Sequence, residues 1–472
     1  EIIHDLAPDA ILGFCGPETS IEFIDCARRL RGQEFGADVI VDDLGFPAEP
    51  YFEDGPIALD AAAAVAGGVL WASSAGNDGD ARFYTADYQA QPLNGDPDYD
   101  SLHDFGLSAG TGSDTTNAVS VPPGSTVTVF LQWSDPFGAS ANDYDLFLLD
   151  AATQQVLAQS IGPQDGNDDP IEAAQFENTG NTSVNALIVI ARLIGAQNRR
   201  LKLFGCLAEP CRLTYASASG QIYGHPAVPG VIATAAIDAL DPGQNDIEPF
   251  SSRGPVEILI PAPELRQKPD IAGIDGVSVT GAGGFPSTFF GTSAASPHIG
   301  ALLALLLSGF DGDAQTALLG TAVDLGAAGR DTVSGTGRAD VMAAARGMNR
   351  KPTAQILSPV TDVGITAGDS VLFEGECADP ENQGGIAFAW DFGNSGLASS
   401  AQQNPGALTF ANAGTFTVTF SCSDAWGVAD SASRTITVAA PAGGGGGAWS
   451  PGWLIVPTLA ALAALRRKTR AA

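Results

Sequence analysis

The segment GTSAASPH, from Gly291 to His298, places a serine where a glycine-led turn opens into a strongly apolar helical pattern. A hydroxyl at such a point is exposed, and backbone N–H groups and the positive end of the helix dipole surround it. Because these donors can stabilise an oxyanion, Ser293 is a candidate nucleophile for acyl transfer. A Gly-Thr-Ser sequence is weak evidence on its own, since many helix caps have the same residues.

A side chain that could assist this chemistry follows a predicted strand earlier in the chain. In the segment SSAGN, Asn77 comes directly after a glycine turn, where its amide can donate to a developing oxyanion. A single Asn after Gly is usually only a turn residue. The segments DVIVDDLG, SSAGN and GTSAASPH occur in this order, at carboxyl ends of predicted strands or at a helix start, and that combination is far more specific.

The elements that position these residues alternate between strands and helices over residues 10–80. AILGF, ADVIVDDLGF and VLWASSAGN have the apolar runs of buried strands, and TSIEFIDCARRL and GPIALDAAAAVAGG have the patterns of helices. The alternation returns later with the strand GVIATAAID, whereas FSSRGP and KPDIAG are predicted as turn-rich loops. The pattern predicts an α/β fold with a mostly parallel sheet and helices on both faces.

These segments resemble the subtilisin-like (S8) serine peptidase family. SSAGN matches the family's oxyanion segment, FSSRGP and KPDIAG match its approach to the serine, and GTSAASPH matches its nucleophile loop nearly residue for residue. The resemblance covers residues 1–82 and 223–347. It implies a subtilisin-like peptidase domain in two parts, serine endopeptidase activity on proteins or peptides, and no required cofactor.

The resemblance also assigns roles to residues. Ser293 would be the nucleophile and Asn77 the oxyanion donor, while Gly45 and Gly76 would border the specificity pocket, because the substrate strand pairs beside them. The family more often has a small or hydroxyl residue where Asp43 stands. A carboxylate there would either favour basic substrate residues or disturb acyl transfer, and the sequence leaves both open.

The family's acid and base, an Asp and then a His, precede the serine. The chain has neither an Asp-x-Gly strand end nor a His-Gly-Thr segment. His4 is interpreted as a helix residue, His225 and His298 are poor candidates for the base, and His103 falls in an inserted region. We therefore expect the base upstream of Glu1, where the pattern indicates missing sequence, or we expect none; the chain alone should be nearly inactive.

The inserted region, residues 83–222, has no helical periods. The apolar residues of one predicted strand alternate on a single face: Val127, Val129, Leu131 and Trp133. Together with Gly, Asn and Asp turns, this predicts a β-sandwich inserted into the α/β domain. LQWSDP and DYDLFLLD resemble the prepeptidase C-terminal type of sandwich. Asp143 and Asp145 could ligate structural calcium, although two spaced carboxylates are usually solvated turn residues.

A second all-β stretch covers residues 351–440, where AWDFGN and GTFTVTFSCSD resemble the polycystic-kidney-disease (PKD) type of sandwich. Residues 441–447 are a glycine linker. Residues 448–466 form an apolar segment just long enough to span a bilayer, and basic residues follow it within 466–470. This tail is similar to the glycine-glycine C-terminal sorting signal of bacterial surface proteins; a frayed apolar tail is the alternative.

The charge and the cysteines limit the partners and the compartment. Acidic residues number 54 against 22 basic ones, a net charge of -32, which makes nucleic acid and anionic membrane surfaces poor partners for the main body. Six cysteines form three local pairs, which favours disulfides over free thiols and an oxidising compartment. The pairs are Cys15 and Cys26, Cys206 and Cys211, and Cys377 and Cys422. We expect an exported protein, extracellular or on the bacterial cell surface.

The sequence therefore predicts a serine endopeptidase that cleaves extracellular proteins through an acyl-enzyme on Ser293. The alternative is a non-enzymatic surface protein, in which a degenerate subtilisin fold carries two sandwiches that bind glycans or proteins. The missing acid and base, together with Asp43, favour the alternative. The intact nucleophile loop and the matching Asn77 oppose it.

Overall fold

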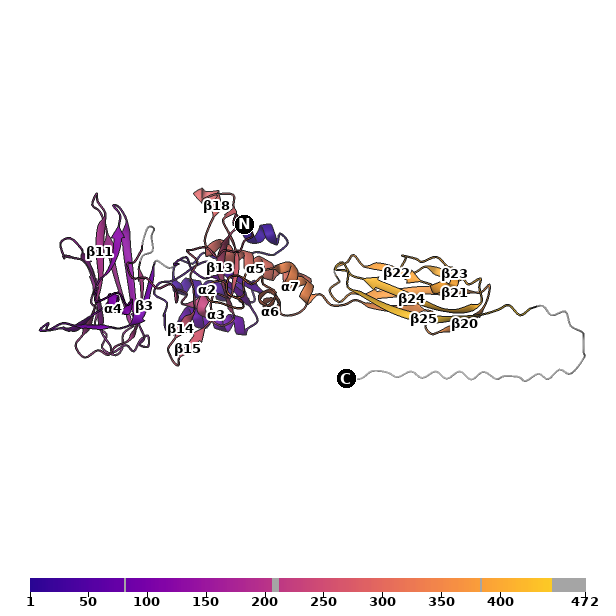
Figure 1. Ribbon diagram of the computed structural model, residues 1–472, viewed down its shortest axis with the longest axis horizontal. Coiled ribbons are helices and arrows are strands. Elements are labelled where there is room, and N and C mark those ends of the chain that lie inside the picture. The colour runs from indigo at the N-terminus through magenta and orange to yellow at the C-terminus, as the bar shows by residue number, and fades with distance from the viewer. Residues whose placement is uncertain (80–81, 206–211, 383, 444–472) are drawn as a thin grey trace, which may run out of the picture. The chain divides into compact units, whose positions relative to one another are not determined.

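The computed structural model describes residues 1–79, 82–205, 212–382 and 384–443. These residues form two compact units, one ending at Asn349 and the other beginning at Arg350 (Figure 1). The first unit contains an α/β domain and the inserted sandwich, and the second is a sandwich alone.

A four-stranded parallel sheet is the centre of the α/β domain. Its order is β1-β2-β13-β16, and all three pairings are parallel. The strands are β1 (Val39–Asp42), β2 (Leu70–Ser74), β13 (Val231–Asp238) and β16 (Ile271–Asp275). Their carboxyl ends share one edge of the sheet, so the segments that follow each strand meet there.

Helices cover both faces of this sheet. Ile40 is buried in one core cluster with α2 (Ser20–Arg31) and α3 (Pro56–Ala66). Its neighbour Val41 lies against α5 (Thr292–Gly309), where a Cβ on Gly300 would stand 2.1 Å from a Val41 methyl carbon. Since successive strand residues point to opposite faces, the two contacts confirm the predicted α/β architecture.

The predicted helices form with the caps their sequences indicate. Thr19 caps α2 by accepting from the Glu22 amide at 3.3 Å, and the Glu22 carboxylate accepts from the Thr19 amide at 3.0 Å. Pro56 begins α3, a position where its missing N–H has no intrahelical partner to lose. The remaining helices of the unit are α1 (Ile2–Leu6), α4 (Phe105–Ser108), α6 (Ala314–Gly320) and α7 (Val341–Met348), with the 3₁₀ turns η1 (His225–Ala227) and η2 (Ala282–Gly284).

Two predictions about this domain were wrong. Residues 10–14 form no strand, and Ile11 and Phe14 are 87% and 96% exposed. An apolar run becomes a strand only where a neighbouring strand accepts its backbone hydrogen bonds, and no described strand pairs with these residues. KPDIAG is not a loop throughout, because β16 begins at its fourth residue, Ile271, which pairs with β13.

The α/β domain also contains two short antiparallel strand pairs. These are β14 (Val256–Ile258) with β15 (Glu264–Arg266), and β17 (Val277–Ser278) with β18 (Thr288–Phe289).

The insert consists of two antiparallel sheets packed on one core. One sheet has the order β10-β7-β12-β3; the other has the order β4-β5-β11-β8-β9, with β6 also paired to β11. The strands are β3 (Phe83–Asp87), β4 (Ala90–Pro92), β5 (Tyr99–His103), β6 (Asn117–Val121), β7 (Thr126–Trp133), β8 (Tyr144–Asp150), β9 (Val156–Ser160), β10 (Ile171–Glu177), β11 (Val184–Leu193) and β12 (Arg200–Gly205). The alternating residues of β7 are all in the core, as their pattern predicts.

The second unit is a seven-stranded sandwich with a disulfide between its sheets. One sheet has the order β19-β21-β23 and the other β20-β25-β24-β22. The strands are β19 (Thr353–Ser358), β20 (Val363–Thr366), β21 (Ser370–Ala378), β22 (Ala387–Asp391), β23 (Gly406–Thr409), β24 (Gly414–Ser423) and β25 (Ala429–Ala439), with η3 (Gly393–Ser395) after β22. Cys377 of β21 is bonded to Cys422 of β24, so the bond links the sheets.

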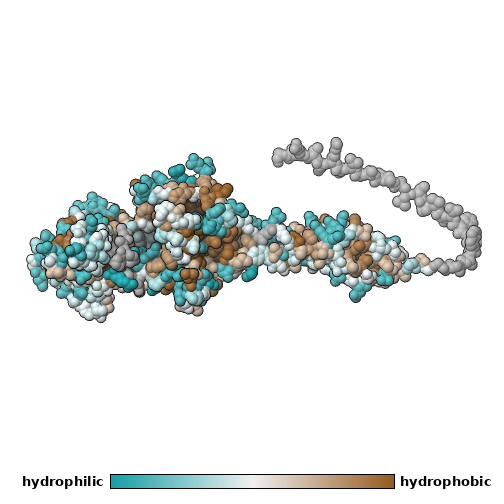
Figure 2. Space-filling view, turned by 90° about the horizontal axis from the view of Figure 1, so that it is seen from above, coloured by the Kyte–Doolittle hydropathy of each residue, from teal (hydrophilic) through white to brown (hydrophobic). Residues whose placement is uncertain are grey.

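Two of the three predicted cysteine pairs form disulfides, Cys15–Cys26 and Cys377–Cys422. Cys206 and Cys211 lie outside the described residues, as does the predicted membrane or sorting segment 448–466. Within the described part of the chain, the one helix long and apolar enough to cross a membrane is α5, and half of its apolar window is buried in the α/β domain. Figure 2 shows apolar surface gathered on the α/β domain, whereas the visible face of the insert is mostly polar.

Candidate active site

Ser293 is the second residue of α5, directly after a turn that requires glycine. Gly291 has a φ of 111°, and a Cβ there would stand 3.1 Å from Nδ2 of Asn77. The Gly291 amide donates to Oδ2 of Asp275 at 2.7 Å. The turn into the helix is therefore fixed by a left-handed backbone and by a carboxylate at the end of β16.

Asn77 is fixed by the residue that precedes the serine. Its Oδ1 accepts from both the amide and the hydroxyl of Thr292, each at 2.9 Å. The Thr292 hydroxyl in turn accepts from the Gly76 amide at 3.2 Å. Because the amide oxygen is occupied, Nδ2 is the free donor of the Asn77 side chain, which is the group an oxyanion requires.

One cavity of about 220 Å³ contains all four predicted site residues. Ser293 and Asn77 line it together with Gly45 and Gly76. No heavy atom lies within 4 Å of a Cβ built on Gly45, so this glycine faces open space. Gly76 is constrained, since its φ is 103° and a Cβ would stand 2.8 Å from the Ser252 hydroxyl. The fold thus brings together four predicted site residues that are far apart in the chain.

Asp43 lines the same cavity as the serine. Burial raises the pKa of the Asp43 carboxyl, and the neighbouring Asp42 carboxylate raises it further. The Ser293 side chain acts in the opposite direction and lowers this pKa. Asp43 is therefore a carboxyl group of raised pKa in the cavity of the candidate nucleophile, and both sequence interpretations of Asp43 stay predictions.

A buried imidazole lies beneath the loop that carries Asp43 and Gly45. His225 is fully buried; its Nε2 is 3.0 Å from Oδ1 of Asp42, and its Nδ1 is 2.9 Å from Oε1 of Glu49. Burial by itself lowers the pKa of His225, but the two carboxylates outweigh it and raise this pKa to about 10. We call Asp42, His225 and Glu49 the buried ion triad. Through His225, it joins Asp42 at the end of β1 to Glu49 in the loop that follows this strand.

The other three histidines form no hydrogen bond with Ser293 among the described residues either. His4 lies in α1, as predicted, and His298 donates from Nδ1 to the Ala294 carbonyl at 2.8 Å within α5. His103 is buried in the insert, where its Nε2 is 2.6 Å from the Tyr84 hydroxyl. All four histidines of the sequence fall in the described residues, and none of the hydrogen bonds found there joins one of them to Ser293.

Sequence reasoning missed several residues that shape this site. Asp275 has no motif of its own, although its carboxylate holds Gly291. Asp78 follows the oxyanion segment and lines the cavity, and burial raises its pKa to about 6 against the opposing effects of Arg82 and Ser252. A polar residue directly after Asn77 was the available signal for Asp78.

The insert also reaches the cavity. Phe204, on β12, lines it, and its ring lies 5.0 Å from that of Phe83. Tyr223, at the return to the α/β domain, lines the cavity and lies 4.6 Å from the Tyr51 ring. The side chain of Gln132 binds the Tyr51 amide and the Glu49 carbonyl, both at 2.9 Å. The inserted sandwich is thus part of the wall of the site.

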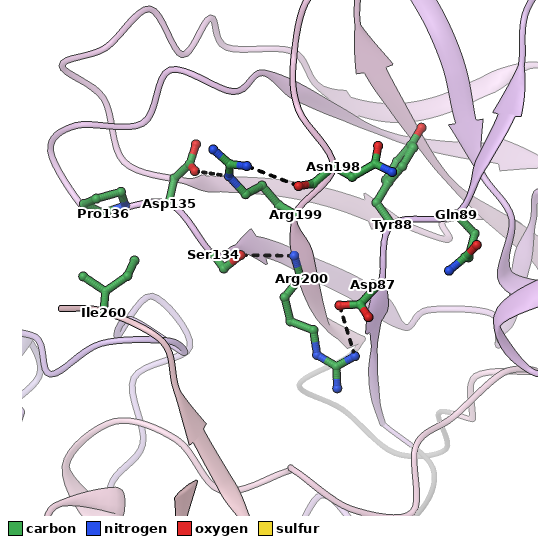
Figure 3. A pocket seen from close by; sticks show the side chains of 10 residues that line it. All are labelled: Asp87, Tyr88, Gln89, Ser134, Asp135, Pro136, Asn198, Arg199, Arg200 and Ile260. Atoms are coloured by element: carbon green, nitrogen blue, oxygen red, sulfur yellow. Dashed lines mark hydrogen bonds and ion pairs between the residues drawn. The ribbon is translucent and has the colours of Figure 1, made fainter. Parts of the chain in front are cut away.

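A larger hollow, of about 710 Å³, shares no lining residue with the Ser293 cavity (Figure 3). Its cations are already paired. Arg199 forms an ion pair with Asp135, and Arg200 lies 3.6 Å from Asp87 and 2.9 Å from Glu257. We assign no chemistry to this hollow.

The predicted calcium ligands lie in the insert. Asp145 accepts a hydrogen bond from the Tyr99 hydroxyl, and burial raises the pKa of Asp143 to about 6. Among the described residues, no group of three or more His, Cys, Asp or Glu side chains is arranged to hold a metal ion. Structural calcium at Asp143 and Asp145 stays a prediction.

Two family models match this chain. The sequence model described as the subtilase family matches residues 28–337, and that described as the PKD domain matches residues 349–439. No curated protein matches the chain.

Solved structures similar to the chain include proteases and an isolated PKD domain. The Clostridium perfringens CspB protease is 15% identical, with a TM-score of 0.46, over 71% of this chain and 72% of that one. Fervidolysin from Fervidobacterium pennivorans, a keratinolytic enzyme related to subtilisin, is 19% identical, with a TM-score of 0.19, over 46% and 37%. The PKD1 domain of Vibrio anguillarum Epp is 29% identical, with a TM-score of 0.16, over 20% and 99%.

Proposed function

Because the chain belongs to the subtilase family of serine peptidases, we propose that it is an endopeptidase that hydrolyses extracellular proteins through an acyl-enzyme on Ser293. The observation that carries this proposal is the single cavity shared by Ser293, Asn77, Gly45 and Gly76. A nucleophile, an amide donor and a glycine-bordered surface for substrate backbone are the parts that acyl transfer to a peptide requires.

The steps follow from these positions. The substrate lies extended beside Gly45 and Gly76. At Gly45, where no heavy atom lies within 4 Å of a Cβ position, the missing side chain leaves room for its backbone. Oγ of Ser293 attacks the scissile carbonyl carbon, and the carbonyl oxygen takes up negative charge. Nδ2 of Asn77 and the backbone N–H of Ser293 donate to that oxygen. The proposed upstream base takes the Oγ proton and gives it to the departing amine as the scissile C–N bond breaks, which leaves the acyl-enzyme. A water molecule then attacks the ester carbon, its proton passes through the same base to the Ser293 oxygen, and the acid product leaves the free serine.

The general base of this proposal comes from sequence upstream of Glu1. One observation supports it: β1 is the terminal strand of the described sheet, so one of its edges has no described partner strand. A groove of about 440 Å³ follows this edge and is lined by apolar residues that include Val39, Val41 and Leu12. A further parallel strand paired there would end at the same edge of the sheet as the Ser293 cavity.

The setting of this activity is outside the cell. The two disulfides and the PKD domain are features of secreted proteins, and proteins are the substrates that the family implies. Anchoring or sorting through residues 448–466 is part of the proposal and rests on sequence alone.

Labelling with a fluorophosphonate tests the proposed nucleophile. The full-length protein should be labelled, and Ser293→Ala should abolish labelling and lower peptide hydrolysis by about 10⁶-fold, the order found when subtilisin itself loses its serine. Ser308→Ala is the matched control, since Ser308 is exposed on the same helix and its hydroxyl binds only the Leu305 carbonyl. It should be labelled like the wild type. Absence of labelling in the wild type would favour the non-enzymatic surface protein instead.

A further inference from the structure

The loop that follows β1 forms one side of the Ser293 cavity. Residues 43–49, which we call the cavity loop, contain no helix or strand, and Asp43, Gly45 and Glu49 of this loop line the cavity. A segment without regular structure has no ladder of backbone hydrogen bonds of its own, so its position depends on the groups that bind its ends. Buried side chains bind the cavity loop at both ends.

Glu49, at the far end of the loop, is buried and is bound from two directions. Its Oε2 accepts from the His225 amide at 3.0 Å, and its Oε1 lies 2.9 Å from Nδ1 of the same residue. Its backbone carbonyl accepts from Nε2 of Gln132, on β7 of the inserted sandwich, at 2.9 Å. Gly224 leaves space for the carboxylate, since a Cβ there would stand 2.6 Å from it. The turn before β13 and the inserted sandwich therefore hold Glu49 together.

His225 also binds the residue at the near end of the loop. Its Nε2 lies 3.0 Å from Oδ1 of Asp42, the last residue of β1. The Asp42 carbonyl accepts from the Ser296 hydroxyl at 2.9 Å, and Ser296 lies on the same helix as Ser293. One imidazole therefore connects both ends of the cavity loop, and the near end is bound to the helix that carries the candidate nucleophile.

The imidazole is charged in this arrangement. Each of its ring nitrogens faces a carboxylate, and a neutral imidazole carries a single N–H, so only the protonated ring donates to both Asp42 and Glu49. Burial lowers the pKa of His225, but the carboxylates outweigh this effect and raise it to about 10. From α2, the Phe23 ring lies 5.0 Å from the imidazole. The other titratable side chains around the triad and the cavity are Asp43, Tyr51, Asp78, Arg82 and Tyr223.

We propose that Glu49 is a positioning residue for substrate binding, and that Gln132 makes the inserted sandwich part of this role. With Glu49 held from two directions, the cavity loop leaves room for a substrate backbone beside Gly45. This inference rests on the proposed function, because it requires the Ser293 cavity to bind a peptide.

The bonds that fix the nucleophile turn are separate from these contacts. Oδ1 of Asn77 accepts from Thr292, and the Gly291 amide donates to Asp275. Loss of a contact at Glu49 should therefore raise KM and leave kcat nearly unchanged, which is the result expected when ground state and transition state lose the same binding.

The first test is steady-state kinetics of the full-length protein on one peptide with Glu49→Gln. The amide keeps an oxygen that can accept from the His225 backbone N–H but has no charge for the imidazole. KM should rise about 10-fold, the size expected for loss of one hydrogen bond between charged groups, and kcat should stay within about 2-fold of the wild type. The fraction of protein that a fluorophosphonate labels at saturation should equal that of the wild type, which shows that the fold is intact.

A second variant tests the contribution of the inserted sandwich. Gln132→Leu removes the bonds to the Glu49 carbonyl and the Tyr51 amide, and it should also raise KM with kcat nearly unchanged. Gln175→Leu is the matched control, since Gln175 is exposed on β10 of the same sheet and its side chain binds the Thr128 hydroxyl. It should leave KM unchanged.

The pH dependence of KM gives a readout that a loss of stability alone would not move. In the wild type, KM should rise at alkaline pH as His225 loses its proton with a pKa of about 10. In Glu49→Gln, one of the two carboxylates that raise this pKa is absent, so the rise should begin at a lower pH. In Gln132→Leu both carboxylates remain, so the rise should stay at the wild-type pH.

Two results would overturn this role of Glu49. The first is an unchanged KM in Glu49→Gln or in Gln132→Leu. The second is a rise of KM at the same alkaline pH in Glu49→Gln as in the wild type, which would mean that His225 does not act on substrate binding through Glu49. Neither result touches the proposed function, whose failure appears separately as an unlabelled wild type or as a labelled Ser293→Ala.

Discussion

The two walls of the Ser293 cavity are held by different kinds of interaction. On the amide wall, which we define as Asn77, Gly291 and Thr292, the bonds run from backbone and hydroxyl donors to an amide oxygen and to Asp275. On the carboxylate wall, defined as Asp43 and the buried ion triad, the contacts join charged groups. Hydrogen bonds therefore hold the amide wall, whereas interactions between charged groups hold the carboxylate wall.

This difference separates what each wall can do. Asn77 does not titrate, so the donor it presents is the same at every pH. The carboxylate wall contains an imidazole whose pKa is raised to about 10 and a carboxyl whose pKa is also raised. We therefore expect changes on the amide wall to alter rates uniformly with pH, and changes on the carboxylate wall to alter the pH response.

The largest effect should come from His225→Leu. It leaves the carboxylates of Asp42 and Glu49 buried without their cation, and removal of one partner from a buried ion pair costs about 3–5 kcal/mol of folding stability. Urea unfolding at neutral pH measures this loss. His103→Leu is the matched control, because His103 is equally buried but its pKa is lowered to about 4 by burial, so a neutral ring is removed. An equal loss in both variants would show that charge does not hold the carboxylate wall.

The next effect concerns catalysis through the amide wall. Asn77→Ala should lower kcat by about 10²–10³-fold, or about 2.7–4 kcal/mol, at every pH. Asn77→Asp should lower it as much, because it keeps an acceptor for Thr292 but lacks the Nδ2 donor. Thr292→Val, which keeps the backbone bond and loses only the hydroxyl bond, should be milder. Steady-state kinetics on one peptide rank the three variants, and a Thr292→Val loss as large as that of Asn77→Ala would remove the oxyanion role.

A smaller effect follows from the titration of His225. Its pKa is about 10 in the folded protein against 6.5 for an unperturbed His, so the folded state holds the extra proton between these values. The stabilisation is complete below pH 6.5 and is lost progressively as the pH rises through 10. One pH unit inside this window should therefore change the stability by only about 1 kcal/mol. The stability difference between wild type and His225→Gln should therefore shrink across this window. A difference that is constant from neutral to alkaline pH would mean that the imidazole is uncharged.

The smallest effect should come from Asp275→Asn. The amide oxygen can still accept from Gly291, and a buried carboxylate with one unpartnered oxygen is removed, so we expect a change in stability below about 1 kcal/mol. Asp275→Ala leaves the Gly291 amide without its acceptor and should cost about 1–3 kcal/mol. Thermal unfolding of the two variants gives the comparison. Equal losses would indicate that the charge of Asp275, and not its acceptor, fixes the turn.

The amide wall could be predicted from the sequence because its residues stand in local patterns. SSAGN and GTSAASPH each contain a glycine turn next to a regular element, and the apolar runs around them are long enough to indicate strand or helix. The parallel sheet then brings the two segments to one edge. Ser293, Asn77, Gly45 and Gly76 accordingly line one cavity, although their catalytic roles stay predictions.

The carboxylate wall had no such local pattern. His225 is 183 residues from Asp42 and 176 from Glu49, and nothing in YGHPAVPG indicates those partners. Asp275 is one acidic residue among 54 Asp and Glu, and its role depends on the register that places it below Gly291. Residues 10–14 show the reverse error, since an apolar run indicated a strand whose pairing partner is not among the described strands.

Phe204 links the inserted sandwich to the shape of the Ser293 cavity. A domain added at a surface loop usually changes location or binding and leaves the chemistry of its host unaltered. Here the added sandwich contributes an aromatic ring to the wall of the cavity that holds the serine. Exchange of this sandwich for another would therefore change the shape of the cavity at the same time as the domain composition.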